Sequence, residues 1–195
     1  MPSNARQLES AVIRSAKVLI VDDEHYMRKV IRTLLLSVGV TDVHEVADGA
    51  HGLDAVAAME PDVVIVDWQM AGMSGIEFVR RVRSPRTFAF PSVPIIMLTG
   101  HGEHWRVIEA MRLGAHEFLL KPVSGKALHA RLASVLLKPR PMVKRGDYYG
   151  PAPRKMIGPR PEIEDALLDL DSQMQVQPWD EPEVDRSLDH VIFVS

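Results

Sequence analysis

The chain has 195 residues, of which 46% are hydrophobic and 25% are charged, and its formal net charge is −3 at pH 7. This composition is typical of a soluble globular protein with one domain of ordinary size and an appendage. The negative charge argues against nucleic-acid binding by the whole chain, because contacts with phosphates need a basic surface. The absence of cysteine excludes disulfides and thiolate metal sites.

The amino-terminal segment, residues 1–16, lacks the unbroken apolar core of a secretory signal. No run in the chain approaches the roughly 18 apolar residues of a membrane-spanning helix. We therefore treat residues 1–16 as an N-terminal extension and expect a cytoplasmic protein without membrane insertion.

Strand-like and helix-like patterns alternate between Lys17 and Leu137. Short apolar runs, most of them rich in β-branched residues, are typical of parallel strands that are buried on both faces. Alternating strands and helices predict a doubly wound α/β domain over residues 17–137, with a parallel sheet, right-handed crossovers and helices on both faces. A helical segment follows each of the expected strands, which lie near residues 17–22, 42–46, 62–67, 94–99 and 116–120.

The first and last helical segments have the clearest signals. The first has apolar residues at helical spacing and ends at Gly39, where a residue that tolerates positive φ is usual. The last begins after Lys121-Pro122, with Ser124 as the expected N-cap. Its inner face is expected to consist of Leu128, Leu132, Val135 and Leu136.

Composition changes near Leu137, where prolines become frequent and the apolar periodicity fades. Up to Arg160 the segment carries seven Lys or Arg residues against one acid, and from Pro161 onward it carries ten acids against one Arg. We therefore expect a low-order tail over residues 138–195 that acts as a linker or an interaction segment. A short helix near residues 163–170 and a strand at residues 191–194 are alternatives that the sequence does not decide.

Polar residues end or follow four of the predicted strands: Asp22 and Asp23, Asp67, Thr99 and Lys121. The carboxyl ends of parallel strands meet at one edge of a sheet, where ligands of open α/β sheets bind. Taken alone, each of these residues is commonly a helix cap or part of a turn. Together they predict a pocket of three carboxylates, one hydroxyl and one ammonium group, which suits a hard metal ion and a phosphoryl group.

The carboxylates of this pocket repel one another, which raises the cost of ionising all of them, and a divalent cation relieves the repulsion. Mg²⁺ prefers oxygen ligands in octahedral geometry and keeps several waters, which leaves room for a phosphoryl oxygen. The Thr99 hydroxyl and the Lys121 ammonium group can each face a further phosphoryl oxygen. Asp67, between a strand and a loop, is the carboxylate best placed to act as the nucleophile.

From Lys17 to about Leu137 the sequence resembles the receiver domain of two-component response regulators, of the chemotaxis type or another stand-alone type. The residues that carry the resemblance are Asp22-Asp23, Asp67 in Val-Asp-Trp-Gln-Met, Thr99-Gly100 and Lys121-Pro122. The resemblance implies a flavodoxin-like (βα)5 fold with a five-stranded sheet in the order 2-1-3-4-5.

The same resemblance implies roles for the site residues. Asp67 is the implied phosphoacceptor. Asp23, Asp67 and the backbone carbonyl of Gln69 are the implied Mg²⁺ ligands, with Asp22 assisting. The implied donor is a phosphohistidine on a histidine kinase or a histidine phosphotransfer protein, and the receiver assists its own phosphorylation and dephosphorylation without being a turnover enzyme.

The resemblance also implies a switch in which Thr99 moves inward and an aromatic residue on the fifth strand, here Phe118, turns inward with it. Phe118 is equally consistent with a plain core aromatic. The output would be a phosphorylation-dependent protein interaction at the surface of the fourth helix, fifth strand and fifth helix. The downstream protein stays unknown, and the sequence leaves open whether phosphorylation drives a homodimer through this surface.

Two functions of other classes are alternatives. An Mg²⁺-dependent aspartyl-phosphate hydrolase of the haloacid-dehalogenase type needs a second Asp two residues after the nucleophile, and that position is Gln69. A nucleic-acid-binding regulator would use the basic part of the tail, where Lys144-Arg145 and Tyr148-Tyr149 are interrupted by glycine and flanked by proline. Both are therefore less favoured than a phosphoryl-accepting signalling protein.

Overall fold

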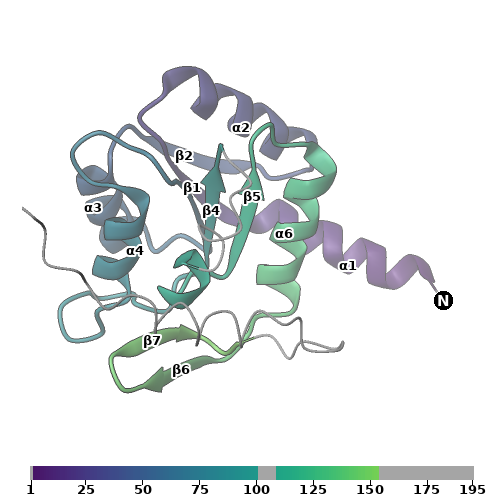
Figure 1. The fold of residues 1–195 in the computed structure, drawn as a ribbon. Coiled ribbons are helices and arrows are strands. Elements are labelled where there is room, and N and C mark those ends of the chain that lie inside the picture. The colour runs from purple at the N-terminus through teal and green to yellow at the C-terminus, as the bar shows by residue number, and fades with distance from the viewer. Residues whose placement is uncertain (1, 101–108, 154–195) are drawn as a thin grey trace, which may run out of the picture. The chain divides into compact units, whose positions relative to one another are not determined.

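The computed structural model describes residues 2–100 and 109–153. Five parallel strands form one sheet in the order β2-β1-β3-β4-β5, so the predicted fold and strand order are confirmed. None of the helices in the described ranges is long and apolar enough to cross a membrane. In chain order the elements are α1 (Pro2–Ser15), β1 (Lys17–Val21), α2 (His25–Ser37), β2 (Asp42–Val46), α3 (Gly49–Met59), β3 (Val63–Asp67), α4 (Gly75–Val82), β4 (Ile95–Thr99), β5 (Glu117–Leu120), α6 (Gly125–Leu137), β6 (Met142–Arg145) and β7 (Tyr148–Pro151) (Figure 1).

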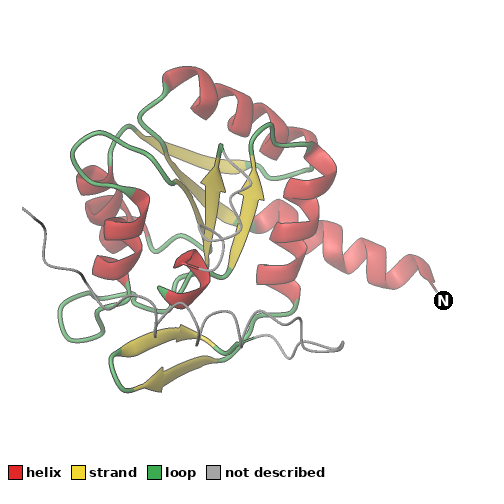
Figure 2. Cartoon of the chain, viewed as in Figure 1, coloured by secondary structure: helices red, strands yellow, loops and turns green. Residues whose placement is uncertain are grey.

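The sheet separates two apolar clusters because successive strand residues point to opposite faces. On β1, Val18 and Ile20 belong to the cluster shared with α2 and α6, whereas Leu19 and Val21 belong to the one shared with α3 and α4. Figure 2 shows the helices on both sides of the yellow sheet. The fourth predicted helix falls largely on residues 101–108, outside the described residues, and residues 109–112 are helical.

Local signals in the sequence explain where the helices begin and end. The predicted N-cap of α6 is confirmed, because the Ser124 hydroxyl accepts a hydrogen bond from the backbone N–H of Ala127 (3.2 Å). Ser74 caps α4 in the same way. Gly39 follows α2 with a φ of 104°, in the left-handed region that favours glycine.

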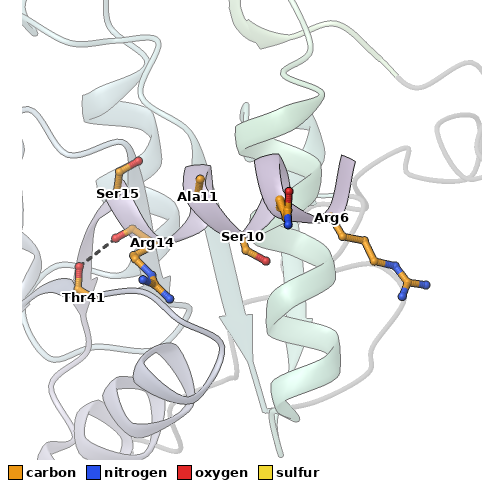
Figure 3. Close-up of a pocket in the computed structure, with 7 residues that line it drawn as sticks. Arg6, Ser10, Ala11, Arg14, Ser15 and Thr41 are labelled. Atoms are coloured by element: carbon orange, nitrogen blue, oxygen red, sulfur yellow. Dashed lines mark hydrogen bonds between the residues drawn. The ribbon is translucent and has the colours of Figure 1, made fainter. Parts of the chain in front are cut away.

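The N-terminal extension contains a helix, α1, that the sequence analysis does not predict. Ile13 and Ala16 are buried in the cluster beneath α6, and the Glu9 carboxylate lies 3.7 Å from the imidazole of His129 on α6. Among the described side chains of α1, those of residues 6–15, only Ile13 is buried, and Leu8 is 65% exposed, so the pattern is weak. The outer side of α1 borders a groove of about 620 Å³ near Arg6, Arg14 and Thr41 (Figure 3).

A hairpin of β6 and β7 begins the segment expected to be a low-order tail, and the sequence analysis does not predict it. The Arg140 guanidinium donates hydrogen bonds to the carbonyl oxygens of Ala152 (3.0 Å) and His116, which ties the hairpin to the start of β5. Next to them lies the buried Arg83, which donates to the carbonyl oxygens of Pro91, Val93 and Gly114. The acidic part of the tail lies outside the described residues.

His116, beneath this hairpin, is buried, and its Nδ1 accepts a hydrogen bond from the backbone N–H of Ile95 (3.3 Å). Burial and the positive charges of Arg83 and Arg140 lower the pKa of His116 from 6.5 to about 3. The neutral imidazole is therefore part of the folded state, while the unfolded chain takes up a proton below pH 6.5.

Acid should therefore destabilise the chain through His116. As the pH falls from 7 to 5, the free energy of unfolding should decrease by about 2 kcal/mol through this residue, because only the unfolded state binds the proton. Denaturant titrations at several pH values measure the slope. His116→Gln should flatten it, and a His116→Gln slope equal to that of the wild type would contradict the prediction.

Candidate functional site

Four strands bring the predicted site residues to the carboxyl edge of the sheet. Asp22 directly follows β1, Asp67 ends β3, Thr99 ends β4 and Lys121 directly follows β5. The parallel register places Asp67 beside Leu98 and Thr99 beside Leu120, so the four strand ends lie side by side. The Lys121 backbone N–H donates to the Thr99 carbonyl oxygen (2.8 Å), which extends the pairing by one residue.

The three acids predicted for this site lie together. Asp22, Asp23 and Asp67 each offer a carboxylate oxygen, and these oxygens lie within 4.8 Å of one another. Asp22 is fully buried and Asp67 is 7% exposed, whereas Asp23 faces solvent. Two carboxylates are therefore held in a poorly hydrated edge while the third remains accessible.

Backbone hydrogen bonds hold two of these carboxylates in place. The N–H of Glu24 donates to Asp22 Oδ1 (2.8 Å), and the N–H of Ala71 donates to Asp23 Oδ2 (2.8 Å). The second bond joins the loop after β1 to the loop after β3. Each bond fixes one oxygen, and the other oxygen of Asp22, Oδ2, lies 3.4 Å from Lys121 Nζ.

Lys121 supplies a positive charge to this cluster. Its Nζ lies 2.8 Å from Asp67 Oδ1 and 3.4 Å from Asp22 Oδ2. Burial acts to lower the pKa of Lys121, but the two carboxylates together outweigh it and the pKa is raised. Burial raises the pKa of Asp67, the Asp22 charge adds to that rise, and the Lys121 ammonium group offsets part of it.

Thr99 is buried at the same edge, 2% exposed, where the sequence analysis places it. Gln69 is exposed in the loop after β3, and the role of its carbonyl oxygen stays a prediction. Phe118 lies on β5, half-buried, with the guanidinium carbon of Arg131 5.7 Å from its ring centroid.

Sequence reasoning missed two residues that support the site. The Arg28 guanidinium donates to the Asp22 carbonyl oxygen (2.8 Å) and lies 3.8 Å from the Glu45 carboxylate, so it ties α2 to the end of β1. Gly75 begins α4 against the carbonyl of Asp67, where a Cβ would lie 2.1 Å from the oxygen. An arginine on an amphipathic helix and a glycine at the start of a helix are common, so neither gives a local signal of its support for the site.

The donor set fits a hard divalent cation. All three acidic side chains provide oxygen atoms, which are the ligands that Mg²⁺ and Ca²⁺ prefer. The cluster carries three carboxylates against the single nearby ammonium group of Lys121, within the described residues. A cation would compensate the remaining repulsion between the carboxylates.

Comparison with known proteins identifies the family. The family model for the response regulator receiver domain matches residues 18–133. The chain belongs to this family. The match spans β1 to most of α6, so the receiver domain contains every site residue described above, whereas α1 and the β6–β7 hairpin lie outside the match.

Several similar proteins are chemotaxis proteins. Chemotaxis protein CheY-3 of Vibrio cholerae is 29% identical over 128 residues, which are 66% of this chain and 97% of that protein. A CheY homolog of Campylobacter jejuni is 36% identical over 121 residues, which are 62% of this chain and 92% of that protein.

Solved structures show the same likeness. The structure of Vibrio cholerae CheY4 crystallized at low pH has a TM-score of 0.56 and 35% identity, and the match covers 62% of this chain and 98% of that one. A putative response regulator from Chloroflexus aurantiacus has a TM-score of 0.58 and 30% identity, and the match covers 63% of this chain and 98% of that one. The receiver fold is therefore shared with these proteins.

Proposed function

We propose that Asp67 of this receiver accepts a phosphoryl group from a phosphohistidine and that the modified chain signals by binding another protein. The observation that carries the proposal is the meeting of Asp67, at the end of β3, with Asp22 and Asp23 after β1 and Lys121 after β5. A histidine kinase or a histidine phosphotransfer protein would be the donor. The downstream protein is a partner whose identity the receiver alone does not define.

In the proposed transfer an Asp67 oxygen attacks phosphorus as the phosphorus–nitrogen bond of the donor breaks. The electron pair of that bond returns to the imidazole nitrogen, and the product is an acyl phosphate on Asp67. Such transfers depend on positioning and on neutralising the phosphoryl oxygens. The Lys121 ammonium group, already 2.8 Å from Asp67 Oδ1, would pair with one of these oxygens.

For the metal we propose Mg²⁺, held by Asp23, Asp67 and the backbone carbonyl of Gln69, with Asp22 assisting. The bound ion would supply positive charge to the phosphoryl oxygens. The carboxylate oxygens of Asp22, Asp23 and Asp67, which lie within 4.8 Å of one another, support this assignment.

For the response we propose a switch made of Thr99 and Phe118. Thr99 ends the strand next to β5, and Phe118 lies on β5 three residues before Lys121. Phosphorylation would draw the Thr99 hydroxyl toward the phosphoryl group and change the position of the Phe118 ring. The surface of β5 and α6, with the helix before β5, would then bind the partner protein or a second copy of the chain.

The receiver would assist its own phosphorylation and dephosphorylation without being a turnover enzyme. A haloacid-dehalogenase-type phosphatase uses an acid two residues after its nucleophile to exchange protons. Gln69 occupies that position here and cannot do so.

Phosphorylation of the full chain tests the proposal. Incubation with acetyl phosphate and Mg²⁺ should add one phosphoryl group, which intact-mass spectrometry detects. Removal of Mg²⁺ by a chelator should prevent the addition. A chain that stays unmodified by acetyl phosphate and by a phosphorylated histidine phosphotransfer protein would contradict the proposal.

Lys121→Ala should separate metal binding from phosphoryl transfer. Without the ammonium group that competes for Asp67 and Asp22, Mg²⁺ should bind at least as tightly as in the wild type, as calorimetry measures. Phosphorylation by acetyl phosphate should slow by about 10- to 100-fold, because one group that neutralises phosphoryl charge is gone. The exposed Lys126→Ala is the control, and a wild-type rate in Lys121→Ala would contradict the role of Lys121.

A further inference from the structure

The side chain of Arg131 reaches around the free edge of β5. Among the described strands, β5 is the outer strand of the sheet and pairs only with β4. Glu117 and Phe118 follow each other on this strand, so their side chains point to opposite faces. Arg131 of α6 contacts both of them, with Nη1 3.7 Å from Glu117 Oε2 and the guanidinium carbon 5.7 Å from the centroid of the Phe118 ring. Its guanidinium therefore joins the two faces of the strand.

The Glu117 end of this contact is fixed. Glu117 is 2% exposed, and the Ser134 hydroxyl donates a hydrogen bond to its Oε1 (2.7 Å). Ser134 and Arg131 lie three residues apart on α6 and therefore share a face of the helix. Two side chains of α6 thus hold one buried carboxylate of β5, and the guanidinium cannot leave the strand edge freely.

The Phe118 end of the contact is held less firmly. The ring is half-buried and carries no hydroxyl, so the guanidinium contacts it through the ring face and not through a hydrogen bond. Within the described residues, Arg131 Nε is buried and has no hydrogen-bond partner. A buried N–H group without a hydrogen-bond partner destabilises the conformation that contains it. A movement of the Arg131 guanidinium that gave Nε a partner would therefore be favourable.

We propose that Arg131 is a positioning residue that holds the Phe118 ring in the unphosphorylated receiver and releases it when the chain is phosphorylated. This rests on the proposed function, because it names what resists the movement of Phe118. Arg131 then opposes the switch, because it stabilises the unphosphorylated state through a contact that is absent from the phosphorylated state.

The phosphate mimic beryllofluoride, added with Mg²⁺, gives a direct measurement. Arg131→Met keeps an apolar side chain of similar length and removes the charge, so the active state should become easier to reach. The affinity of the full chain for beryllofluoride should rise by about two- to five-fold, which is the size of an exposed cation–π contact. The exposed Lys126→Met on the same helix is the control and should leave the affinity unchanged.

A double-mutant cycle separates the ring contact from the Glu117 contact. Arg131→Met also weakens the hold on the Glu117 carboxylate, but that loss is the same whether or not Phe118 is present. In a Phe118→Leu background Arg131→Met should therefore leave the beryllofluoride affinity unchanged. Thermal unfolding of each variant confirms that the protein is folded.

The outcomes are distinct. A rise in the beryllofluoride affinity of Arg131→Met that depends on Phe118 supports the proposed role of Arg131. If the affinity does not rise, or rises equally with and without Phe118, the proposed role of Arg131 is wrong and the assignment of Asp67 is unaffected. Failure of the wild-type chain to bind beryllofluoride with Mg²⁺ overturns the proposed function, and the proposal for Arg131 with it.

Discussion

Asp67→Asn should abolish the addition of a phosphoryl group by acetyl phosphate and leave the receiver folded. An amide oxygen is a far weaker nucleophile than a carboxylate oxygen, and the amide cannot form a stable acyl phosphate. The substitution keeps the size of a side chain that is 7% exposed at the end of β3, so the packing is preserved. Intact-mass spectrometry would show the unmodified mass.

The same variant should lose little stability. The amide side chain would give up the ion pair with Lys121 Nζ at 2.8 Å, but the substitution would also remove a buried charge from beside Asp22. These effects oppose each other, so a net change of about 1 kcal/mol or less is expected in the free energy of unfolding. Asp54→Asn on the exposed face of α3 is the matched control, and it should be phosphorylated normally. Equal phosphorylation of wild type and Asp67→Asn would refute Asp67 as the acceptor.

The receiver fold and most of the site could be predicted because the information is local. Each predicted strand lies within one residue of an observed strand at either end. For β1, β3 and β4 the reason is that a buried parallel strand is a short apolar run followed or ended by a polar residue. Asp22, Asp67 and Thr99 are such residues, and parallel topology alone brings them to one edge of the sheet. The prediction that these three residues lie close together therefore requires no knowledge of long-range contacts.

The hairpin could not be predicted in the same way. Its strands have four residues each, and prolines surround them, which is the composition of a low-order segment. What orders it is a set of contacts distant in sequence, such as the bond from Arg140 to the His116 carbonyl. The buried Arg83, which satisfies three backbone carbonyl groups, looks in the sequence like any arginine at the end of a helix.

The support that Gly75 gives to the site was also invisible in the sequence, and it leads to the second large expected effect. Gly75→Ala should destabilise the receiver and disturb Asp67. An alanine Cβ would lie 2.1 Å from the Asp67 carbonyl oxygen and 3.1 Å from the Cα of Trp68. Neither backbone can give way easily, because β3 is paired on both sides, with β1 and with β4. The overlap between the alanine Cβ and the Asp67 carbonyl oxygen could be relieved only by a shift of the start of α4 or of the Asp67 peptide.

The matched control is Gly125→Ala. Gly75 and Gly125 both occupy the first position of a helix after a serine N-cap, Ser74 and Ser124. Around Gly125 the nearest atoms to a Cβ are 3.8 Å away or more, so alanine fits there. Any difference between the two variants therefore reports the close approach to Asp67 and not the general effect of alanine at a helix start.

Gly75→Ala should lower the free energy of unfolding by about 1–3 kcal/mol through overpacking, as denaturant titration measures. Its Mg²⁺ affinity and its rate of phosphorylation should fall as well, because the carboxylate of Asp67 must shift together with its backbone. Gly125→Ala should be neutral or stabilise the chain by up to about 1 kcal/mol, since alanine favours the helix. Equal stability and equal phosphorylation of the two variants would show that the close approach of α4 does not hold the phosphoacceptor in place.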